Sequence, residues 1–183
     1  MKNICIFCSA CEDIKPAYFE RARQLGEWMG ANGYDLVYGG VDLGLMGCTA
    51  RAVKSSGGKL TGVVPGRFED DGKISQLCDT IIQVADLSER KDRMVQLADC
   101  IIALPGGVGT LDEVFTVMAA ASVGYHGKRV IFYNMDGFYD RLVSLMQGLR
   151  DEGFLRHPLD EYFLVADNLE EIISSLQQYG RKH

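Results

Sequence analysis

Short apolar runs alternate with amphipathic stretches along the chain, and this alternation limits the fold more than any other feature. The apolar runs are continuous, which is typical of strands that are buried on both faces of a sheet. Strands are predicted at 3–8, 34–38, 59–64, 79–84, 100–104, 129–133 and 161–165. Helices are predicted at 16–31, 45–56, 87–98, 110–123, 137–151 and 168–178. We therefore predict an α/β fold with a single Rossmann-like, doubly wound parallel sheet of about seven strands and helices on both faces.

Length and charge narrow the classes of function. The 183 residues fit one domain spanning 1–183. The net charge of −6 argues against nucleic acid as a partner, because binding to its backbone depends on a broad basic surface. No apolar run is long enough to span a bilayer, and the opening MKNICIFCSA favours a buried strand over a signal peptide. We expect a cytoplasmic protein without a membrane partner.

Six cysteines raise the question of a metal site. Cys5 and Cys8 are three residues apart on a predicted strand, so they point to opposite faces and cannot chelate one ion together. Cys48, Cys78 and Cys100 are scattered in apolar contexts. We predict no metal site and reduced, mostly buried thiols.

Glycine-rich turns follow four of the predicted strands. They are CSACED after 3–8, GGVDLGLMG after 34–38, PGRFEDDG after 59–64 and PGGVGT after 100–104. The carboxyl ends of parallel strands meet at one edge of an open α/β sheet, where ligands bind. We predict a ligand site at this edge, with the irregular segment 65–75 near it.

The glycine turns do not match a classical nucleotide motif. Neither GGVDLG nor GVGTLD fits G-x-G-x-x-G, and PGGVGT lacks the Lys of a Walker motif. A turn at the start of a helix remains, where backbone N–H groups and the helix dipole favour an anion. Gly106, Gly107, Gly109 and Thr110 suit a single phosphate in that position.

The two acids after this turn have a purely structural alternative. TLDE matches a capping box, with Thr110 as the N-cap residue and Glu113 at N3. Asp112 and Glu113 in the first turn would also complement the helix dipole. The sequence leaves this alternative open for Glu113.

The helix predicted at 110–123 is apolar on all its faces, so we expect it to be buried on every side. The sheet alone cannot cover such a helix, and a two-fold partner is the simplest further cover. Glu113 at the start of this helix would then lie in a low-dielectric environment. Burying a carboxylate there costs free energy, so we expect it to have a function.

Arg90 is the second reason to expect a functional Glu113. A helical projection at about 100° per residue places Arg90 in a core-facing stripe of the helix at 87–98. The other members of the stripe are Leu87, Met94, Leu97 and Ala98. Charged residues are uncommon in such stripes unless they are paired, although Arg can also snorkel or form a structural ion pair. We predict that Arg90 and Glu113 converge on the phosphate-binding turn.

At these residues the chain resembles a known family. ERKDRM (89–94) followed by PGGVGTLDE (105–113) resembles the paired motifs of the LONELY GUY (LOG) family, the cytokinin riboside 5′-monophosphate phosphoribohydrolases formerly labelled lysine decarboxylases. ICIFCSA, LVYGGVDLGLMG and NMDGFYDRL extend the likeness over nearly the whole chain. The resemblance implies a dimeric hydrolase that cleaves a purine nucleoside 5′-monophosphate into free base and ribose 5-phosphate, with no metal or organic cofactor.

The resemblance also implies roles for individual residues. Arg90 and Glu113 would be the catalytic pair. Substrate and phosphate would be bound by Lys91, Gly106, Gly107, Val108, Gly109, Thr110, Leu111 and Asp112, together with Gly39 and Gly40. A carboxylate can stabilise an oxocarbenium-like ribosyl cation and orient or deprotonate water. Arg90 would hold the phosphate or the ribose and stabilise the leaving base. It would not act as a proton donor, because a guanidinium group stays protonated.

The chain departs from the family pattern at several positions, and these leave the preferred base open between prenylated adenine and adenine. They are Leu87-Ser88, Val41, Ser9-Ala10-Cys11 and Ala119-Ala120.

The same residues bear on two other enzyme classes and on one class of binding protein. A pyridoxal decarboxylase lacks support, because neither glycine turn carries a Schiff-base Lys. A nucleoside deoxyribosyltransferase would use the carboxylate as a covalent nucleophile. A nucleotide carrier would not need both Arg90 and Glu113. His126, His157 and His183 are predicted to be structural or exposed.

Overall fold

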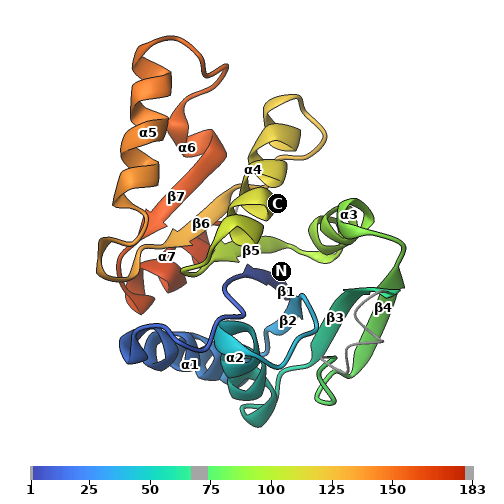
Figure 1. Cartoon of the computed structure of the whole chain (residues 1–183). Helices are drawn as coiled ribbons and strands as arrows, with labels where there is room; N and C mark the ends of the chain where they lie inside the picture. The colour runs from blue at the N-terminus through green and yellow to red at the C-terminus, as the bar shows by residue number, and fades with distance from the viewer. Residues whose placement is uncertain (1, 67–73, 180–183) are drawn as a thin grey trace.

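A single parallel sheet organises the structure (Figure 1). This computed structural model describes residues 2–66 and 74–179. The strands are β1 (Asn3–Phe7), β2 (Asp35–Tyr38), β3 (Leu60–Pro65), β4 (Thr80–Val84), β5 (Cys100–Ala103), β6 (Val130–Tyr133) and β7 (Phe163–Ala166). Neighbouring strands pair in parallel, in the order β4-β3-β2-β1-β5-β6-β7. The predicted α/β fold with a seven-stranded parallel sheet is confirmed.

Helices cover both faces of this sheet. They are α1 (Pro16–Ala31), α2 (Gly44–Ser55), α3 (Leu87–Leu97), α4 (Val108–Ser122), α5 (Asp140–Asp151), α6 (Leu159–Tyr162) and α7 (Leu169–Tyr179), with a 3-10 turn η2 (Met135–Gly137). Within residues 2–66 and 74–179, no helix has the length and apolar character that a bilayer span requires.

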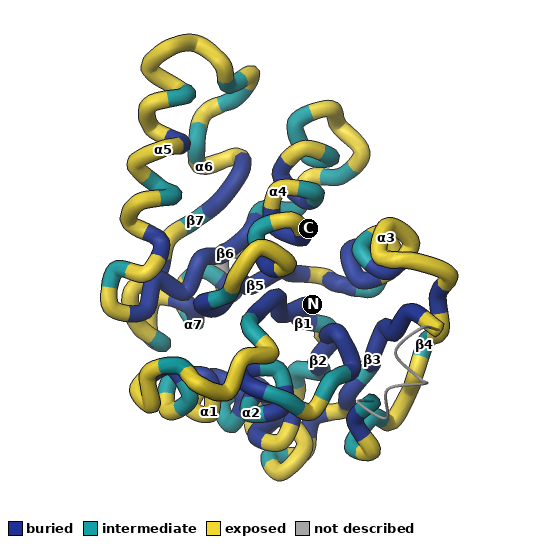
Figure 2. Tube along the Cα trace, in the orientation of Figure 1, coloured by how far each residue is buried: buried dark blue, intermediate teal, exposed yellow. Residues whose placement is uncertain are grey.

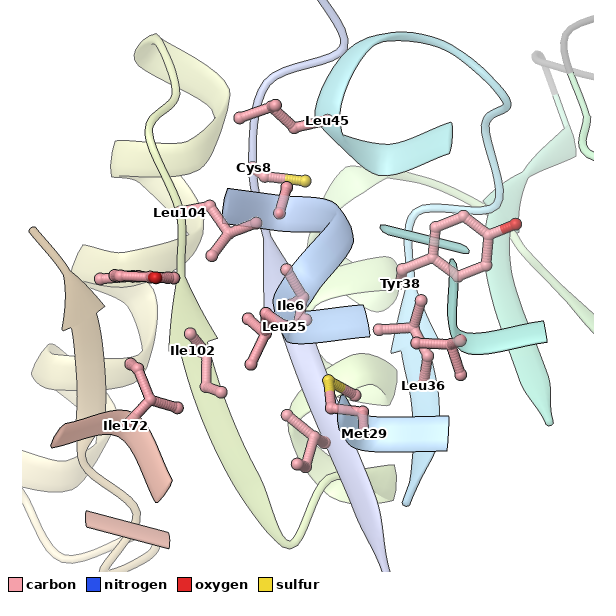
Figure 3. Close-up of a cluster of buried hydrophobic side chains, with 14 of the residues drawn as sticks. Ile6, Cys8, Leu25, Met29, Leu36, Tyr38, Leu45, Ile102, Leu104 and Ile172 are labelled. Carbon is pink, nitrogen blue, oxygen red and sulfur yellow. The ribbon is translucent and has the colours of Figure 1, made fainter. Parts of the chain in front are cut away.

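The alternation of side chains along each strand divides the core into two layers. In β1, Ile4 and Ile6 join the layer under α1, α2 and α7, whereas Cys5 and Phe7 join the layer under α3, α4 and α5. Figure 3 shows the first layer, where Leu25 of α1 packs near Ile6. In Figure 2 the strands β1, β2, β3, β5 and β6 are almost continuously buried, whereas the edge strand β4 is mostly exposed. The sheet is thus covered on both faces, as continuous apolar strands require.

The strand order reverses at the centre of the sheet. From β1 the chain proceeds outward through β2, β3 and β4, and then returns so that β5 pairs with the other side of β1. In open α/β sheets, such a reversal opens a crevice at the carboxyl ends of the two central strands. The turns after β1 and β5 therefore lie where the fold class places a ligand.

Two predicted elements begin later than the sequence pattern indicates. The helix predicted at 137–151 begins at Asp140, because Asp136 (φ 54°) and Gly137 (φ 73°) are left-handed and interrupt it. The strand predicted at 161–165 is β7, and its first two predicted residues belong to α6. Both differences are local turns, which periodicity alone does not reveal.

Asn134 and Tyr139 connect the end of β6 to the end of β5. Asn134 Oδ1 accepts the Tyr139 N–H at 2.7 Å, and the Asn134 amide donates to two aspartate carboxylates at 2.9 Å. The Tyr139 hydroxyl donates to the Leu104 carbonyl at 2.6 Å. Leu104 directly precedes Pro105, so this buried hydroxyl supports the start of the glycine turn.

Replacing Tyr139 by Phe removes that donor from a buried carbonyl. We expect the free energy of unfolding, measured by urea denaturation, to fall by about 1–3 kcal/mol. Tyr125→Phe is the matched control, because Tyr125 is 84% exposed, and we expect it to change stability by less than about 0.5 kcal/mol. Equal stabilities of the two variants would contradict a supporting role for the Tyr139 hydroxyl.

Candidate active site

The turns after β1, β2 and β5 meet at the carboxyl edge of the sheet, as predicted. Ser9, after β1, donates its N–H to the Pro105 carbonyl after β5 at 3.1 Å. The Ser9 carbonyl accepts the N–H of Leu45, in the first turn of α2, at 3.0 Å. Of the predicted loop 65–75, residues 67–73 lie outside the described residues.

The start of α4 overturns the capping-box interpretation. Gly107 is the N-cap residue, and no side chain caps the helix. Thr110 is therefore at N3, and Glu113 lies in the second turn, too far along the helix to close a box. The sequence pattern placed Gly109 in the turn, but the Leu111 N–H already donates to the Gly107 carbonyl at 3.0 Å, so the backbone is helical there.

The uncapped start of α4 contrasts with the helices beside it. At α3 the Asp86 carboxylate accepts the N–H groups of Ser88 and Glu89, and at α2 the Ser9 carbonyl has the corresponding role. The first N–H groups of a helix have no intrahelical acceptor. Gly107, Val108 and Gly109 are exposed, so the first turn of α4 is accessible to an anion.

Arg90 and Glu113 meet between α3 and α4, which confirms that they converge. Arg90 Nη1 donates to Glu113 Oε1 at 3.1 Å. Arg90 Nε donates to the Val63 carbonyl of β3 at 3.0 Å. Arg90 is 8% exposed and Glu113 is 5% exposed, so both charged groups lie inside the protein. The guanidinium of Arg90, on α3, is therefore held by a carbonyl of β3 and by the carboxyl group of Glu113 on α4.

The predicted stripe on α3 is wrong for one residue. Arg90, Met94 and Ala98 are buried and Leu97 is half-buried, but Leu87 is 54% exposed. Residues 87–89 are all exposed, so contact between α3 and the sheet begins one turn after its first residue.

The single chain leaves part of α4 uncovered, and the expectation that the helix is buried on every side, with a two-fold partner as the further cover, stays a prediction. Val114, Val117 and Met118 pack against the sheet. On the outer face, Phe115 is 40% exposed, and Val123 just after the helix is 54% exposed. The sheet covers one face of α4, and an apolar face remains open in the single chain.

Burial changes the acidity of Glu113. It raises the pKa of this carboxyl to about 7, while the Arg90 guanidinium counteracts the effect by lowering the pKa. Among weaker influences, the Asp112 carboxylate raises the pKa and the Lys91 ammonium lowers it. A carboxyl group with a pKa near neutrality is present in both forms and can exchange a proton with a reacting group.

Lys91 and Asp112 form a second pair next to the first. Lys91 Nζ donates to Asp112 Oδ1 at 2.9 Å and to Oδ2 at 2.8 Å. The Lys91 side chain is 15% exposed, and that of Asp112 is 54% exposed. Lys91 thus lies near the start of α4, paired with a carboxylate that is accessible to solvent.

Gly39 and Gly40, which follow β2, differ in their surroundings. Gly40 is left-handed (φ 71°), and a side chain there would meet Val64. Gly39 lies against the Arg90 guanidinium. Sequence reasoning missed the Val63 carbonyl, which also holds Arg90, because a backbone acceptor has no characteristic residue type. Of the predicted binding residues, Gly106 and Leu111 are half-buried and Thr110 is buried.

Cys5 and Cys8 lie close enough to Arg90 and Glu113 for these charged groups to influence their thiols. The six cysteines are free, and burial raises the pKa of Cys5 and Cys8 well above the usual range of a thiol. In the described part of the chain, no three His, Cys, Asp or Glu residues are grouped as metal ligands. His126 is half-buried before β6, and His157 contacts the Ser122 carbonyl at 3.1 Å. His183 is outside the described residues.

Comparison with known sequences places the chain among proteins of one activity. Residues 46–176 match the family model described as "Possible lysine decarboxylase". Cytokinin riboside 5′-monophosphate phosphoribohydrolase LOG5 of Arabidopsis thaliana is 36% identical over 97% of this chain and 78% of its own length. LOG7 of the same plant, also a cytokinin riboside 5′-monophosphate phosphoribohydrolase, is 38% identical over 97% of this chain and 82% of its own length.

Solved structures share the fold at lower identity. The Moco carrier protein of Chlamydomonas reinhardtii is 23% identical and superimposes with a TM-score of 0.74, covering 100% of this chain and 99% of its own. The molybdenum cofactor binding protein of Rippkaea orientalis is 21% identical, with a TM-score of 0.71 and 97% coverage of both chains. At these identities the likeness is one of fold.

The pKa of Glu113 links folding to pH. The carboxyl has a pKa of about 4.5 before folding and about 7 after it, so the folded chain binds this proton more tightly. The resulting stabilisation is complete below about pH 4.5 and is lost as the pH rises through about 7. Glu113→Gln stays neutral, so we expect the stability of the wild type relative to this variant to fall between about pH 4.5 and about pH 7 and to stay constant above that.

Chemical denaturation at intervals of pH measures this difference, and Glu152→Gln on the exposed C-cap of α5 is the control. Parallel pH profiles of the wild type and Glu113→Gln would contradict a raised pKa at Glu113.

Proposed function

The chain belongs to the cytokinin riboside 5′-monophosphate phosphoribohydrolase (LOG) family, and we therefore propose that it hydrolyses the N-glycosidic bond of purine nucleoside 5′-monophosphates. The products are the free base and ribose 5-phosphate. One observation carries the proposal: a buried Arg90–Glu113 pair lies at the same sheet edge as a helix that no side chain caps.

The phosphate binds at the start of α4 in this proposal. The N–H groups of Val108, Gly109 and Thr110 face the anion, and the Lys91 ammonium lies nearby. Glu113 follows Val108 by five residues, which corresponds to about 7–8 Å along the helix axis. A ribose ring can bridge this distance from its 5′-phosphate to its anomeric carbon, so phosphate binding at the turn brings that carbon towards Glu113.

Glu113 acts on the anomeric carbon and on water. The bond between this carbon and the base nitrogen breaks with its electron pair leaving on the base, and the positive charge on ribose is stabilised by the carboxylate. Water then forms the new bond to carbon and transfers a proton to the carboxylate. A pKa of about 7 suits a group that must be ionised before the step and protonated after it.

Arg90 has two roles in this proposal: it favours the ionised form of Glu113, and it contacts the substrate. Its positive charge opposes the effect of burial and so maintains an ionised fraction of Glu113. A guanidinium remains charged and has several donors, so it can also hold the ribose or phosphate and steady the leaving base. Because Arg90 does not release its proton, the leaving base takes up a proton from water, and Glu113 afterwards returns the proton it accepted to the solvent.

A deoxyribosyl transfer is the second candidate, because a carboxylate at this position could also attack the anomeric carbon itself. Trapping of a glycosyl-enzyme on Glu113 would favour it over direct hydrolysis. The preferred purine, adenine or prenylated adenine, depends on residues such as Leu87-Ser88 and Ala119-Ala120, which differ from the family pattern.

The wild type is expected to release free base and ribose 5-phosphate from AMP or isopentenyladenosine monophosphate, and little from the nucleosides. Glu113→Gln should lower turnover by about 100-fold or more while the protein remains folded, because it removes the charge and the proton acceptor. Chromatographic detection of the base measures turnover, and circular dichroism checks the fold. Unchanged turnover in Glu113→Gln would refute the catalytic role of this residue.

We further propose a cytoplasmic homodimer with α4 at or near its two-fold interface. The outer apolar face of α4, with Phe115, and the adjacent Val123 need cover that this chain does not provide. The open pocket between α4 and α5, lined by Phe115, Met118 and Phe154 among others, extends this apolar surface.

Phe115→Asp places a charge on that face, so we expect a dimer in the wild type and a monomer in the variant at micromolar concentration. Analytical ultracentrifugation measures both. Ile81→Asp is the matched control and should leave the dimer intact, because Ile81 is 46% exposed and its strand β4 lies at the sheet edge, away from α4 (Figure 1). A monomeric wild type would contradict the proposed dimer.

A further inference from the structure

The position of Gly39 has no room for a side chain, because the Arg90 guanidinium lies where its Cβ atom would be. Its neighbour Gly40 has a positive φ of 71°, a conformation that favours glycine, but Gly39 is not among the glycines with positive φ. A Cβ atom built on Gly39 would overlap Nη2 of Arg90 and lie 3.2 Å from its Cζ. The same atom would lie 3.3 Å from Met46 Sδ. The volume of a side chain at Gly39 is therefore occupied by the guanidinium.

Each nitrogen of this guanidinium has a different neighbour. Nε donates to the Val63 carbonyl at 3.0 Å, and Nη1 donates to Glu113 Oε1 at 3.1 Å. Nη2 lies over Gly39. A planar group that is held on three sides has little freedom to rotate. We propose that Gly39 is a positioning residue, whose missing side chain leaves the space in which Arg90 reaches Glu113.

A methyl group at Gly39 can be accommodated most easily by moving Arg90. Gly39 directly follows β2, which pairs with β1 on one side and with β3 on the other, so a large backbone shift at Gly39 would disturb strand pairing. The guanidinium is the far end of a flexible side chain and moves at lower cost. Gly39→Ala is therefore expected to separate Arg90 from Glu113 while the sheet stays intact. This gives Gly39 a role that is independent of direct contact with a phosphate.

The expected effect of Gly39→Ala on kcat rests on the proposed hydrolase activity. The position of Arg90 can be tested without that activity, through the pKa of Glu113. Gly39→Ala should lower kcat for AMP by about 10- to 100-fold, since misplacing a catalytic group by about 1 Å has effects of this size. The ionised carboxylate is the active form, and withdrawal of the positive charge raises the pKa of Glu113 further. The acidic limb of the kcat profile should therefore move to higher pH.

Gly148→Ala on α5 is the matched control. A side chain at Gly148 would meet no atom within 4 Å, and the position is exposed, so kcat and the pH profile should remain those of the wild type. A uniform loss of folded protein would lower the apparent kcat of Gly39→Ala without moving its acidic limb, and the limb therefore separates positioning from general destabilisation.

A double-mutant cycle with Arg90→Ala tests the proposed pair directly. Arg90→Ala empties the space over Gly39, so Gly39→Ala should have no further effect on stability or on the Glu113 pKa in that background. The double variant also provides the test if Gly39→Ala alone does not fold, because it should then fold as well as Arg90→Ala. Equal effects of Gly39→Ala in both backgrounds would overturn the proposal.

Titration of Glu113 by carboxyl-carbon NMR separates a failure of the proposed hydrolase function from a failure of the proposed positioning role of Gly39. If the wild type hydrolyses neither AMP nor isopentenyladenosine monophosphate, the proposed function fails, but a raised Glu113 pKa in Gly39→Ala still supports the positioning role. If the wild type is active and Gly39→Ala keeps both the kcat and the Glu113 pKa of the wild type, the positioning role fails alone.

Discussion

The buried contact between Arg90 and Glu113 is the constraint on which the rest of the site depends. Removing a charged group from water costs several kcal/mol, and a single ion-pair contact returns this only with good geometry and further hydrogen bonds. The structure supplies one such bond from the Val63 carbonyl and leaves Glu113 partly neutral by raising its pKa. A pair of this kind is weak evidence for stability. Its presence inside an apolar layer is therefore better explained by chemistry than by folding.

The order of the strands brings this pair to the glycine turn that follows β5. Because β5 returns to pair with β1, the helices that follow β4 and β5 lie side by side on one face, with their first turns at the carboxyl edge. α3 then presents Arg90 and Lys91, and α4 presents its uncapped start and Glu113. The net charge of the chain is −6, yet the proposed phosphate site has local positive charge, because helix dipole and side chains act within a few ångströms.

Much of this arrangement follows from the sequence, and the rest depends on contacts that the sequence does not encode locally. Continuous apolar strands and glycine turns predict the sheet and its ligand edge, and the polar Arg90 in an apolar stripe predicts its pairing. The start of α4 could not be fixed, because Gly109 is equally compatible with a turn and a first helical residue. The exposure of Leu87 depends on where α3 meets the sheet. The Val63 carbonyl is a backbone group, and residue type carries no information about it.

The shared fold does not by itself separate a hydrolase from a carrier. Proteins described as Moco carrier and molybdenum cofactor binding proteins adopt it at identities of 21–23%, where likeness extends to architecture alone. A protein that only holds a phosphorylated ligand needs an exposed anion site, which the first turn of α4 provides. It gains nothing from a carboxyl group buried one turn further along and held near neutrality by opposing effects of burial and Arg90. A group that must change its protonation state during a reaction needs that balance, and Glu113 therefore favours the enzyme over the carrier.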